Sequence, residues 1–373
     1  MTTTLTISTP AQFLSLVPSV LGFHPVRSLV AVPTRRGRSL GALRIDLPPD
    51  DDPDAGERLA SSVVGLVCRV TDVDAMVAVV YTDAPAGDAL PHRRLAEALS
   101  LSAEACGLPL TDVLVVAADG WGSHLDPLLP EGGRSLAALA PPEIEDGPEV
   151  AGDQAAGAAL PRHEPAEVKA VTAATKAVRA ALALIGEAAG VPRPGRRGRV
   201  DPAALEVAGA LVDLPRFAED ALEWDAAHLT PLQAAAVSLC LSRPALRDVA
   251  LVDWAADLET GRRALRAQRG WEEGAAYPAE LARILWGEGR RPAPARLEAA
   301  LALARHVAAL TRRSDRPGAL AACAWLSWAL GRSTHAERYA AQALAIDPEH
   351  GLGGIMRSFV AAGHLPDWAF RVG

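Results

Sequence analysis

Apolar residues in the first third of the chain alternate between helical and strand-like spacing. They recur at helical spacing over residues 10–21, 53–70 and 92–106. Short apolar runs lie at residues 28–33, 75–81 and 113–118, and residues 40–47 alternate apolar with charged side chains. The pattern predicts a helix, a strand hairpin, and then helix–strand–helix–strand.

The two later runs, 75–81 and 113–118, are apolar on both faces. Such strands are typical of parallel sheets covered by helices on both sides. The strand 40–47 has one polar face, which favours an antiparallel hairpin with residues 28–33. We therefore expect residues 1–135 to form a three-layer α/β domain with a mixed sheet, in which an antiparallel hairpin joins parallel strands.

The chain then changes character. Residues 136–164 belong to a stretch rich in Gly, Pro and Asp with weak periodicity, which predicts a linker or a functional loop. Residues 165–373 are helical throughout, and helix starts recur as a capping residue followed by proline, as at Asp201 and Thr230. Most of the tryptophans lie in this part, which indicates that its core is helical.

A segment near 318–348 resembles one tetratricopeptide repeat (TPR). Gly331 would end its first helix, small residues at Ala336, Ala340 and Ala343 would let the second helix approach the first, and Pro348 would end the hairpin. One such hairpin cannot bury its own face. We therefore expect a TPR-like helical-hairpin array in which earlier helices supply the neighbours.

Five blocks of sequence carry a wider resemblance: LGFHP at 21–25, SLV at 28–30, RIDLP at 44–48, DVLVVAADGW at 112–121 and AWL at 324–326. Through them the whole chain resembles a bacterial family of unknown function, the one numbered 4192. Members often carry several cysteines shortly after the block that ends at Trp121, and this chain has none there. The resemblance therefore implies the fold, and no activity, metal or disulfide.

The charge and composition of the chain limit the classes of partner that it can bind. The net charge of −8 disfavours nucleic acid and anionic membranes, which need a basic surface. The one dense basic loop, residues 193–199, leaves a nucleic-acid-associated regulator as the weakest alternative. The start of the chain lacks the features of a signal peptide, no apolar run is long enough to span a membrane, and the four cysteines are scattered, so we expect a cytoplasmic protein with reduced thiols.

Two candidate ligand-binding positions follow the predicted strand 113–118. Ligands of open α/β sheets bind beyond the carboxyl ends of the strands. Asp119 would accept hydrogen bonds there and Trp121 would offer a stacking face. A tight turn with a half-buried tryptophan is the alternative interpretation. His124 and Asp126 supply two of the three ligands of a facial metal site, but the spacing defines no third ligand, and we predict no metal.

A second group of candidates lies around the predicted hairpin. His24 and Arg27 precede the first strand, and Arg44 and Asp46 share one face of the returning strand. His24 is a candidate general base, or a phosphate ligand together with the two arginines. The alternative is that His24 caps the preceding helix and that Arg44 simply pairs with Asp46.

The sequence contains no P-loop, dinucleotide-binding glycine motif, nucleophile elbow, HExxH or CxxC cluster. We therefore expect no cofactor and favour a non-catalytic protein-binding or scaffold protein, with a protein partner or self-association. The alternative is a small-molecule-binding or enzymatic α/β domain with its site near His24 and Asp119.

Overall fold

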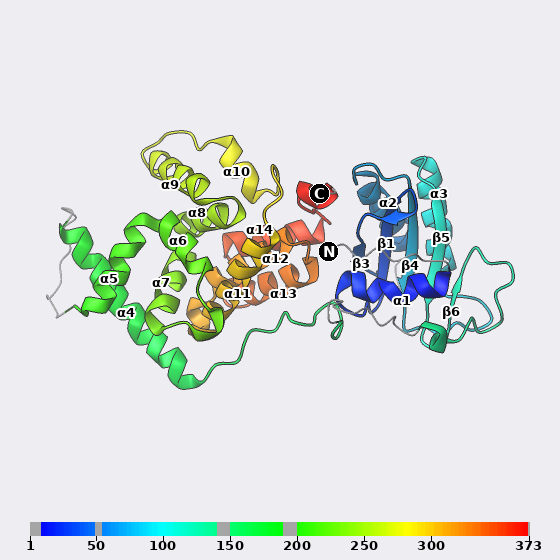
Figure 1. Cartoon of the computed structure of the whole chain (residues 1–373), viewed down its shortest axis with the longest axis horizontal. Helices are drawn as coiled ribbons and strands as arrows, with labels where there is room; N and C mark the ends of the chain where they lie inside the picture. The colour runs from blue at the N-terminus through cyan, green and yellow to red at the C-terminus, as the bar shows by residue number, and fades with distance from the viewer. Residues whose placement is uncertain (1–8, 49–53, 140–149, 189–199, 372–373) are drawn as a thin grey trace. The chain divides into compact units, whose positions relative to one another are not determined.

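The computed structural model describes residues 9–48, 54–139, 150–188 and 200–371. It divides into two compact units (Figure 1). The first unit runs to Ala156 and also includes Phe370, and the second unit comprises Gly157–Ala369. Helix α4 begins at Pro165 within the second unit.

The first unit contains a mixed sheet, as the sequence predicts. Its strands are β1 (Ser28–Arg35), β2 (Arg38–Ser39), β3 (Leu43–Asp46), β4 (Ala75–Tyr81), β5 (Leu110–Val116) and β6 (Trp121–Ser123). They are ordered β2–β1–β4–β5–β6, and β3 also pairs with β1. Among the strands of the described residues, only β4 and β5 pair in parallel, and β4 runs antiparallel to β1.

Helices cover both faces of this sheet, which confirms the three-layer prediction. Helix α1 (Pro10–Leu21) packs on one face through Leu14 and Val17. Helices α2 (Ala55–Cys68) and α3 (Arg93–Ala105) pack on the other face, which Figure 1 shows opposite α1. Helix α1 begins where the sequence indicates, since the Thr9 hydroxyl accepts from the backbone N–H of Gln12 at 3.3 Å.

Two details of the sheet differ from the sequence pattern. The returning strand is interrupted between β2 and β3, where Gly41 has a φ of +124°. Strand β6 is not among the strands that the sequence pattern predicts. A Cβ at Gly120 would lie 2.4 Å from the carbonyl oxygen of Gly132, so only glycine allows the chain to pass so close at the entry to β6.

The second unit is a helical array, as predicted. Its helices are α4 (Pro165–Ala188), α5 (Pro202–Ala210), α6 (Leu214–Leu222), α7 (Pro231–Leu241), α8 (Pro244–Ala255), α9 (Leu258–Glu272), α10 (Ala279–Leu285), α11 (Pro294–Leu310), α12 (Pro317–Ala329), α13 (Ser333–Leu344) and α14 (Gly351–Ala361). Within the described residues, no helix combines the length and apolarity needed to cross a membrane.

Tryptophans form much of the core of the helical array. Trp254, Trp325 and Trp328 are fully buried, and each indole N–H donates to a backbone carbonyl at 2.7–3.0 Å. Such pairing allows large aromatic side chains to be buried without leaving a polar atom unsatisfied. Trp271 and Trp286 differ, because both are more than half exposed.

Helices α12 and α13 form the predicted hairpin. Gly331 lies between them with a φ of +80°, and its N–H donates to the carbonyl of Trp328 at 2.9 Å. Ala336, Ala340 and Ala343 are fully buried. Their small size lets α13 lie close to α12, as the sequence pattern indicates.

Candidate functional sites

The six residues predicted to bind a ligand lie at one edge of the sheet. The pairing register aligns Asp46 with Ser28, Ser28 with Tyr81, Tyr81 with Val116, and Val116 with Trp121. This row is the edge where the parallel strands β4 and β5 end. Because neighbouring strands lie about 4.8 Å apart, the β3 end and the β6 end of the row are separated by roughly 19 Å.

The residues at the β1–β3 end make structural contacts. Arg44 is almost completely buried, its Nε donates to the Ser28 hydroxyl at 2.7 Å, and it forms an ion pair with Asp46. His24 and Arg27 are exposed. The backbone N–H of His24 donates to the carbonyl of Gly152, and Arg27 has a left-handed φ of +46°.

The residues at the β5–β6 end also support a turn. The Asp119 carboxylate accepts from the backbone N–H of Ala86 at 2.8 Å. The Trp121 indole donates to the carbonyl of Ser135 at 3.1 Å and is 5% exposed. Each end thus keeps its own partners, and ligand binding by the six residues stays a prediction.

One cavity of about 590 Å³ includes Trp121 and none of the other five predicted residues. Its polar groups already have partners. The Ser123 hydroxyl donates to Asp112, and Arg134 pairs with Asp126 at 2.5 Å. The hydrogen bond from Arg134 holds the pKa of the Asp126 carboxyl below its usual range. A ligand here would have to break these pairs.

His124 and Asp126 do not form a common site. The His124 Nε2 atom lies 3.1 Å from the carbonyl oxygen of Pro91, and burial lowers the pKa of its imidazole. Over the residues that the structure describes, no group of three or more His, Cys, Asp or Glu is arranged to hold a metal. The basic loop 193–199 lies outside the described residues.

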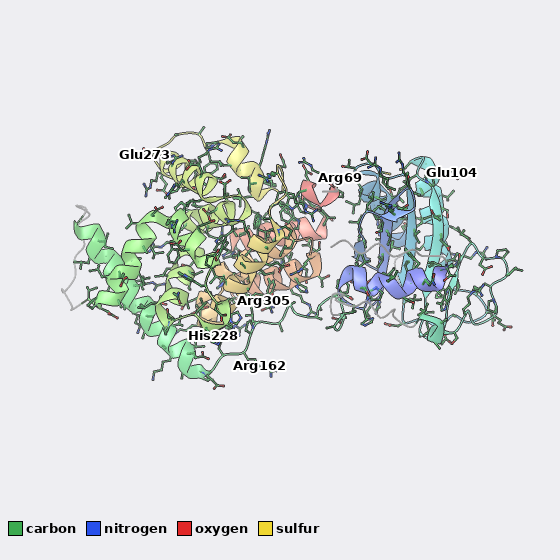
Figure 2. The ribbon with its side chains drawn as sticks, in the orientation of Figure 1. Arg69, Glu104, Arg162, His228, Glu273 and Arg305 are labelled. Atoms are coloured by element: carbon green, nitrogen blue, oxygen red, sulfur yellow. The ribbon has the colours of Figure 1, made fainter. Side chains whose placement is uncertain are left out.

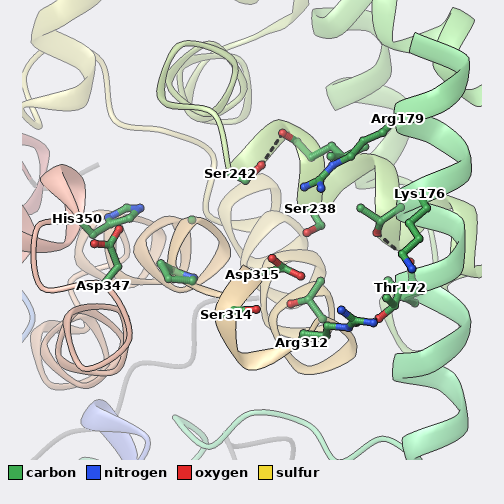
Figure 3. Close-up of a pocket in the computed structure, with 16 residues that line it drawn as sticks. Thr172, Lys176, Arg179, Ser238, Ser242, Arg312, Ser314, Asp315, Asp347 and His350 are labelled. Carbon is green, nitrogen blue, oxygen red and sulfur yellow. Dashed lines mark hydrogen bonds between the residues drawn. The ribbon is translucent and has the colours of Figure 1, made fainter. Parts of the chain in front are cut away.

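A cavity of about 260 Å³ lies within the helical unit (Figure 3). It is bordered by α4, by the end of α7, by the first turn of α12 and by the segment before α14. Figure 3 shows three basic side chains on one side of it, Lys176, Arg179 and Arg312, and Asp347 with His350 on the other. No pattern along the sequence predicts this site, because its residues come from four separate segments.

The distribution of lysine in the sequence indicates one residue of this cavity. Arginine supplies nearly all the positive charge of the chain, and the only lysines are Lys169 and Lys176, both on α4. Lys176 lines the cavity, whereas Lys169 does not. In the described part of the chain, neither Lys176 nor Arg179 forms an ion pair.

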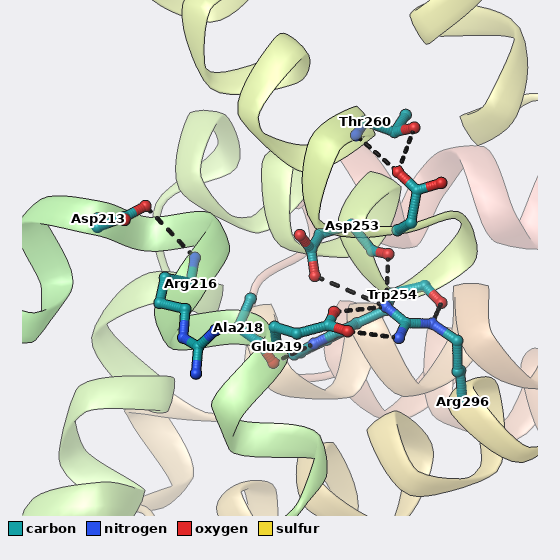
Figure 4. A network of polar contacts seen from close by, with 9 residues as sticks. Asp213, Arg216, Ala218, Glu219, Asp253, Trp254, Thr260 and Arg296 are labelled. Carbon is teal, nitrogen blue, oxygen red and sulfur yellow. Dashed lines mark hydrogen bonds and ion pairs between the residues drawn. The ribbon is translucent and has the colours of Figure 1, made fainter.

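A second polar group is enclosed between α6, α8 and α11 (Figure 4). Arg296 holds Glu219 through two hydrogen bonds of 2.8 and 2.7 Å and also donates to the carbonyl of Asp253 at 3.0 Å. The Asp253 carboxyl is fully buried, and Arg296 lies 3.9 Å from it. Burial, and then the negative charge of Glu219, raise the pKa of Asp253 to about 8, so its carboxyl is mostly protonated at neutral pH.

The third feature is an extended stretch that precedes α4. We call residues 157–164 the strap segment. Arg305 on α11, labelled in Figure 2, donates to the carbonyl of Ala159 at 2.6 Å. Ring nitrogens of His163 and His306 lie 3.1 Å apart. Ala158 is 1% exposed, and Leu160 packs against the main helical core. The helical array therefore holds an extended chain through both its backbone and its apolar side chains.

The fold and these sites define a two-unit protein with a mixed-sheet α/β unit and a helical array. Residues 10–282 match a family described as a domain of unknown function (DUF4192), and the chain belongs to that family. The match covers the α/β unit and the helical unit as far as α10. No curated protein and no solved structure matches the chain.

Proposed function

We propose that this is a non-catalytic scaffold protein of the bacterial cytoplasm, whose TPR-like helical array binds an extended segment of a protein partner. The observation that supports this function is the strap segment, an extended piece of the chain seated on α11. Helical-hairpin arrays present extended surfaces of this kind to other proteins.

The contacts of the strap segment are those of peptide recognition. Arg305 binds a backbone carbonyl, which every peptide offers, and the apolar contact of Leu160 with the helical core provides the sequence preference. The Arg305 Nε atom is buried and has no hydrogen-bond partner within the described residues. Arg305 therefore contacts the strap segment through a terminal nitrogen, while its Nε atom is closed to solvent and to a partner.

The strap segment occupies this surface and therefore competes, within the same chain, with a partner peptide. A tethered segment acts at an effective concentration on the order of millimolar, so a free peptide competes poorly until the tethered one is released. The same segment of a second copy is the simplest partner, which would make the contact a route to self-association. Nucleic acid is not a partner in this proposal, because the chain is acidic.

The test uses a fluorescent peptide of residues 154–165 and the full-length chain. Replacing Leu160 with Asp removes the main apolar contact of the strap segment and should release it. We expect the peptide to bind the Leu160→Asp variant at least about tenfold more tightly than the unchanged chain, measured by fluorescence anisotropy. Adding Arg305→Ala to that variant should abolish the gain, because the carbonyl contact is lost.

Arg338→Ala is the matched control, since Arg338 is exposed on α13 and forms no hydrogen bond or ion pair with the described residues of the strap segment. It should leave peptide binding within about twofold, as is usual for surface positions. The proposal is wrong if the released variant fails to bind the peptide, or if binding survives Arg305→Ala.

A further inference from the structure

We propose that the cavity between α4, α7 and the first turn of α12 binds a small phosphorylated molecule that also carries hydroxyl groups. This site is separate from the surface that holds the strap segment. Its test therefore does not depend on the protein-binding proposal.

The basic side of the cavity suits a phosphate. Lys176 and Arg179 lie one turn apart on α4, so both side chains project from the same face of that helix. Arg312, from the segment before α12, lies on the same side of the cavity, and its Nε donates to the Thr172 hydroxyl of α4 at 3.1 Å. That hydrogen bond orients the guanidinium and leaves its terminal nitrogens available to an anion.

The hydroxyl of Ser238 also faces the cavity. Ser238 on α7 is only 6% exposed and lines the cavity, and its hydroxyl makes no hydrogen bond to any described residue. Figure 3 shows it between Arg179 and Asp315. Solvent still reaches this hydroxyl, and a ligand oxygen would accept its hydrogen bond in place of water.

The N-terminal end of α12 adds to the attraction for an anion. Pro317 and Gly318, the first residues of α12, line the cavity. Pro317 has no N–H, so Gly318 and Ala319 supply the first N–H groups of α12, which have no partner within the helix and carry a partial positive charge. Together with three basic side chains and Ser238, they form a site of several converging donors.

The acidic side of the cavity determines what else the ligand carries. Asp315 and Asp347 line it without forming an ion pair among the described residues. Burial lowers the pKa of His350, and its Nδ1 accepts from the backbone N–H of Gly353, so the neutral ring keeps a proton on Nε2. Two carboxylates beside a neutral imidazole repel a second phosphate and accept hydrogen bonds from hydroxyl groups.

The volume limits the size of the ligand. About 260 Å³ is below the range of roughly 300–1,000 Å³ typical of sites for drug-sized molecules. It suits a sugar monophosphate, with the phosphate beside the basic residues and the hydroxyls beside Asp315 and Asp347. A folded phosphopeptide or a larger nucleotide would extend beyond the cavity.

The test is isothermal titration calorimetry on the full-length protein with ribose 5-phosphate, ribose, inorganic phosphate and a phosphoserine peptide. We expect ribose 5-phosphate to bind more tightly than inorganic phosphate, and ribose not to bind. Lys176→Ala should weaken binding at least about tenfold, because it removes a charge-assisted contact, and Ser238→Ala should weaken it several-fold. Both variants should retain the melting temperature of the unchanged chain within about 3 °C.

Lys169→Ala is the matched control, because it removes the same charge from the same helix outside the cavity, and it should change the affinity by less than about twofold. Three results would each overturn the proposal. They are equal loss of affinity in Lys169→Ala and Lys176→Ala, absence of binding by ribose 5-phosphate at millimolar concentration, and tighter binding of the phosphoserine peptide than of the sugar phosphate.

Discussion

Asp253 shows most clearly how one residue departs from its usual chemistry. It lies at the end of α8, where Gly261 on α9 approaches so closely that a Cβ there would be 2.1 Å from its carboxylate oxygen. No solvent reaches it, and neither carboxyl oxygen has a hydrogen-bond partner within the described residues. A proton on Asp253 is therefore less costly than a negative charge beside Glu219.

This arrangement predicts a specific dependence of stability on pH. The pKa of Asp253 is about 8 in the folded chain and near 4 when unfolded, so the folded state binds the extra proton between these values. The stability that this proton provides is complete below pH 4 and is lost as the pH rises to about 8. Asp253→Asn should remove that slope and become more stable than the unchanged chain above pH 8, by at least about 1 kcal/mol.

The measurement is the free energy of unfolding from urea titrations between pH 5 and pH 9. Glu273→Gln is the control, since Glu273 is exposed at the end of α9, as Figure 2 shows, and should leave the slope unchanged. Parallel pH profiles for Asp253→Asn and the unchanged chain would show that Asp253 does not hold the extra proton.

At the scale of elements, local pattern and capping explain most boundaries in the α/β unit. The helix predicted at residues 10–21 has the same bounds in the structure, because Thr9 caps it and Gly22 ends it with a φ of +79°. The strand predicted at residues 75–81 also has the same bounds in the structure. Strand β6 was missed because its three residues show no periodicity and pair only through the turn at Asp119.

Close packing between helices makes some glycines irreplaceable. Gly318 in the first turn of α12 abuts the end of α7, where an added Cβ would lie 2.2 Å from the carbonyl oxygen of Leu241. We expect Gly318→Ala to lower the free energy of unfolding by about 2 kcal/mol or more, since backbone atoms have to move. Thermal and urea unfolding of the purified variant would measure the loss.

Gly354→Ala on α14 is the matched substitution, because nothing lies within 4 Å of the added methyl. There we expect a gain of up to about 1 kcal/mol from the better helix propensity of alanine. A loss of equal size in both variants would mean that the contact with Leu241 is not the cause.

At the scale of the whole molecule, each unit has a buried core of its own. The α/β core is made of strand and helix residues such as Val79 and Leu114, whereas the helical core is built around Trp254 and Trp325. The family match spans parts of both units, so the family combines them in one chain.

Separate cores predict separate unfolding events. Val79→Ala should lower only the melting temperature of the α/β unit, by about 3 °C or more, because it leaves a cavity in that core. Intrinsic fluorescence follows the helical unit, since Trp121 alone belongs to the α/β unit, and its transition should not move. Calorimetry and fluorescence melts together measure this, and one shared transition shifted by Val79→Ala would contradict it.

The sequence by itself determined what depends on neighbours along the chain. Periodicity, caps and glycines predicted the helices, the buried strands, the mixed three-layer unit and the helical hairpin at Gly331. These features follow from contacts over a few residues, which a linear pattern records.

Only the tertiary structure decided which distant segments meet. It spread the predicted ligand residues along one sheet edge, placed the Ser28 hydroxyl against Arg44, and brought Lys176, Ser238 and Arg312 to one cavity. It also seated the strap segment on Arg305. Lys176 and Ser238 are 62 positions apart in the sequence, and Ala159 and Arg305 are 146 positions apart. No periodic pattern along the chain encodes which residues at such separations will face each other.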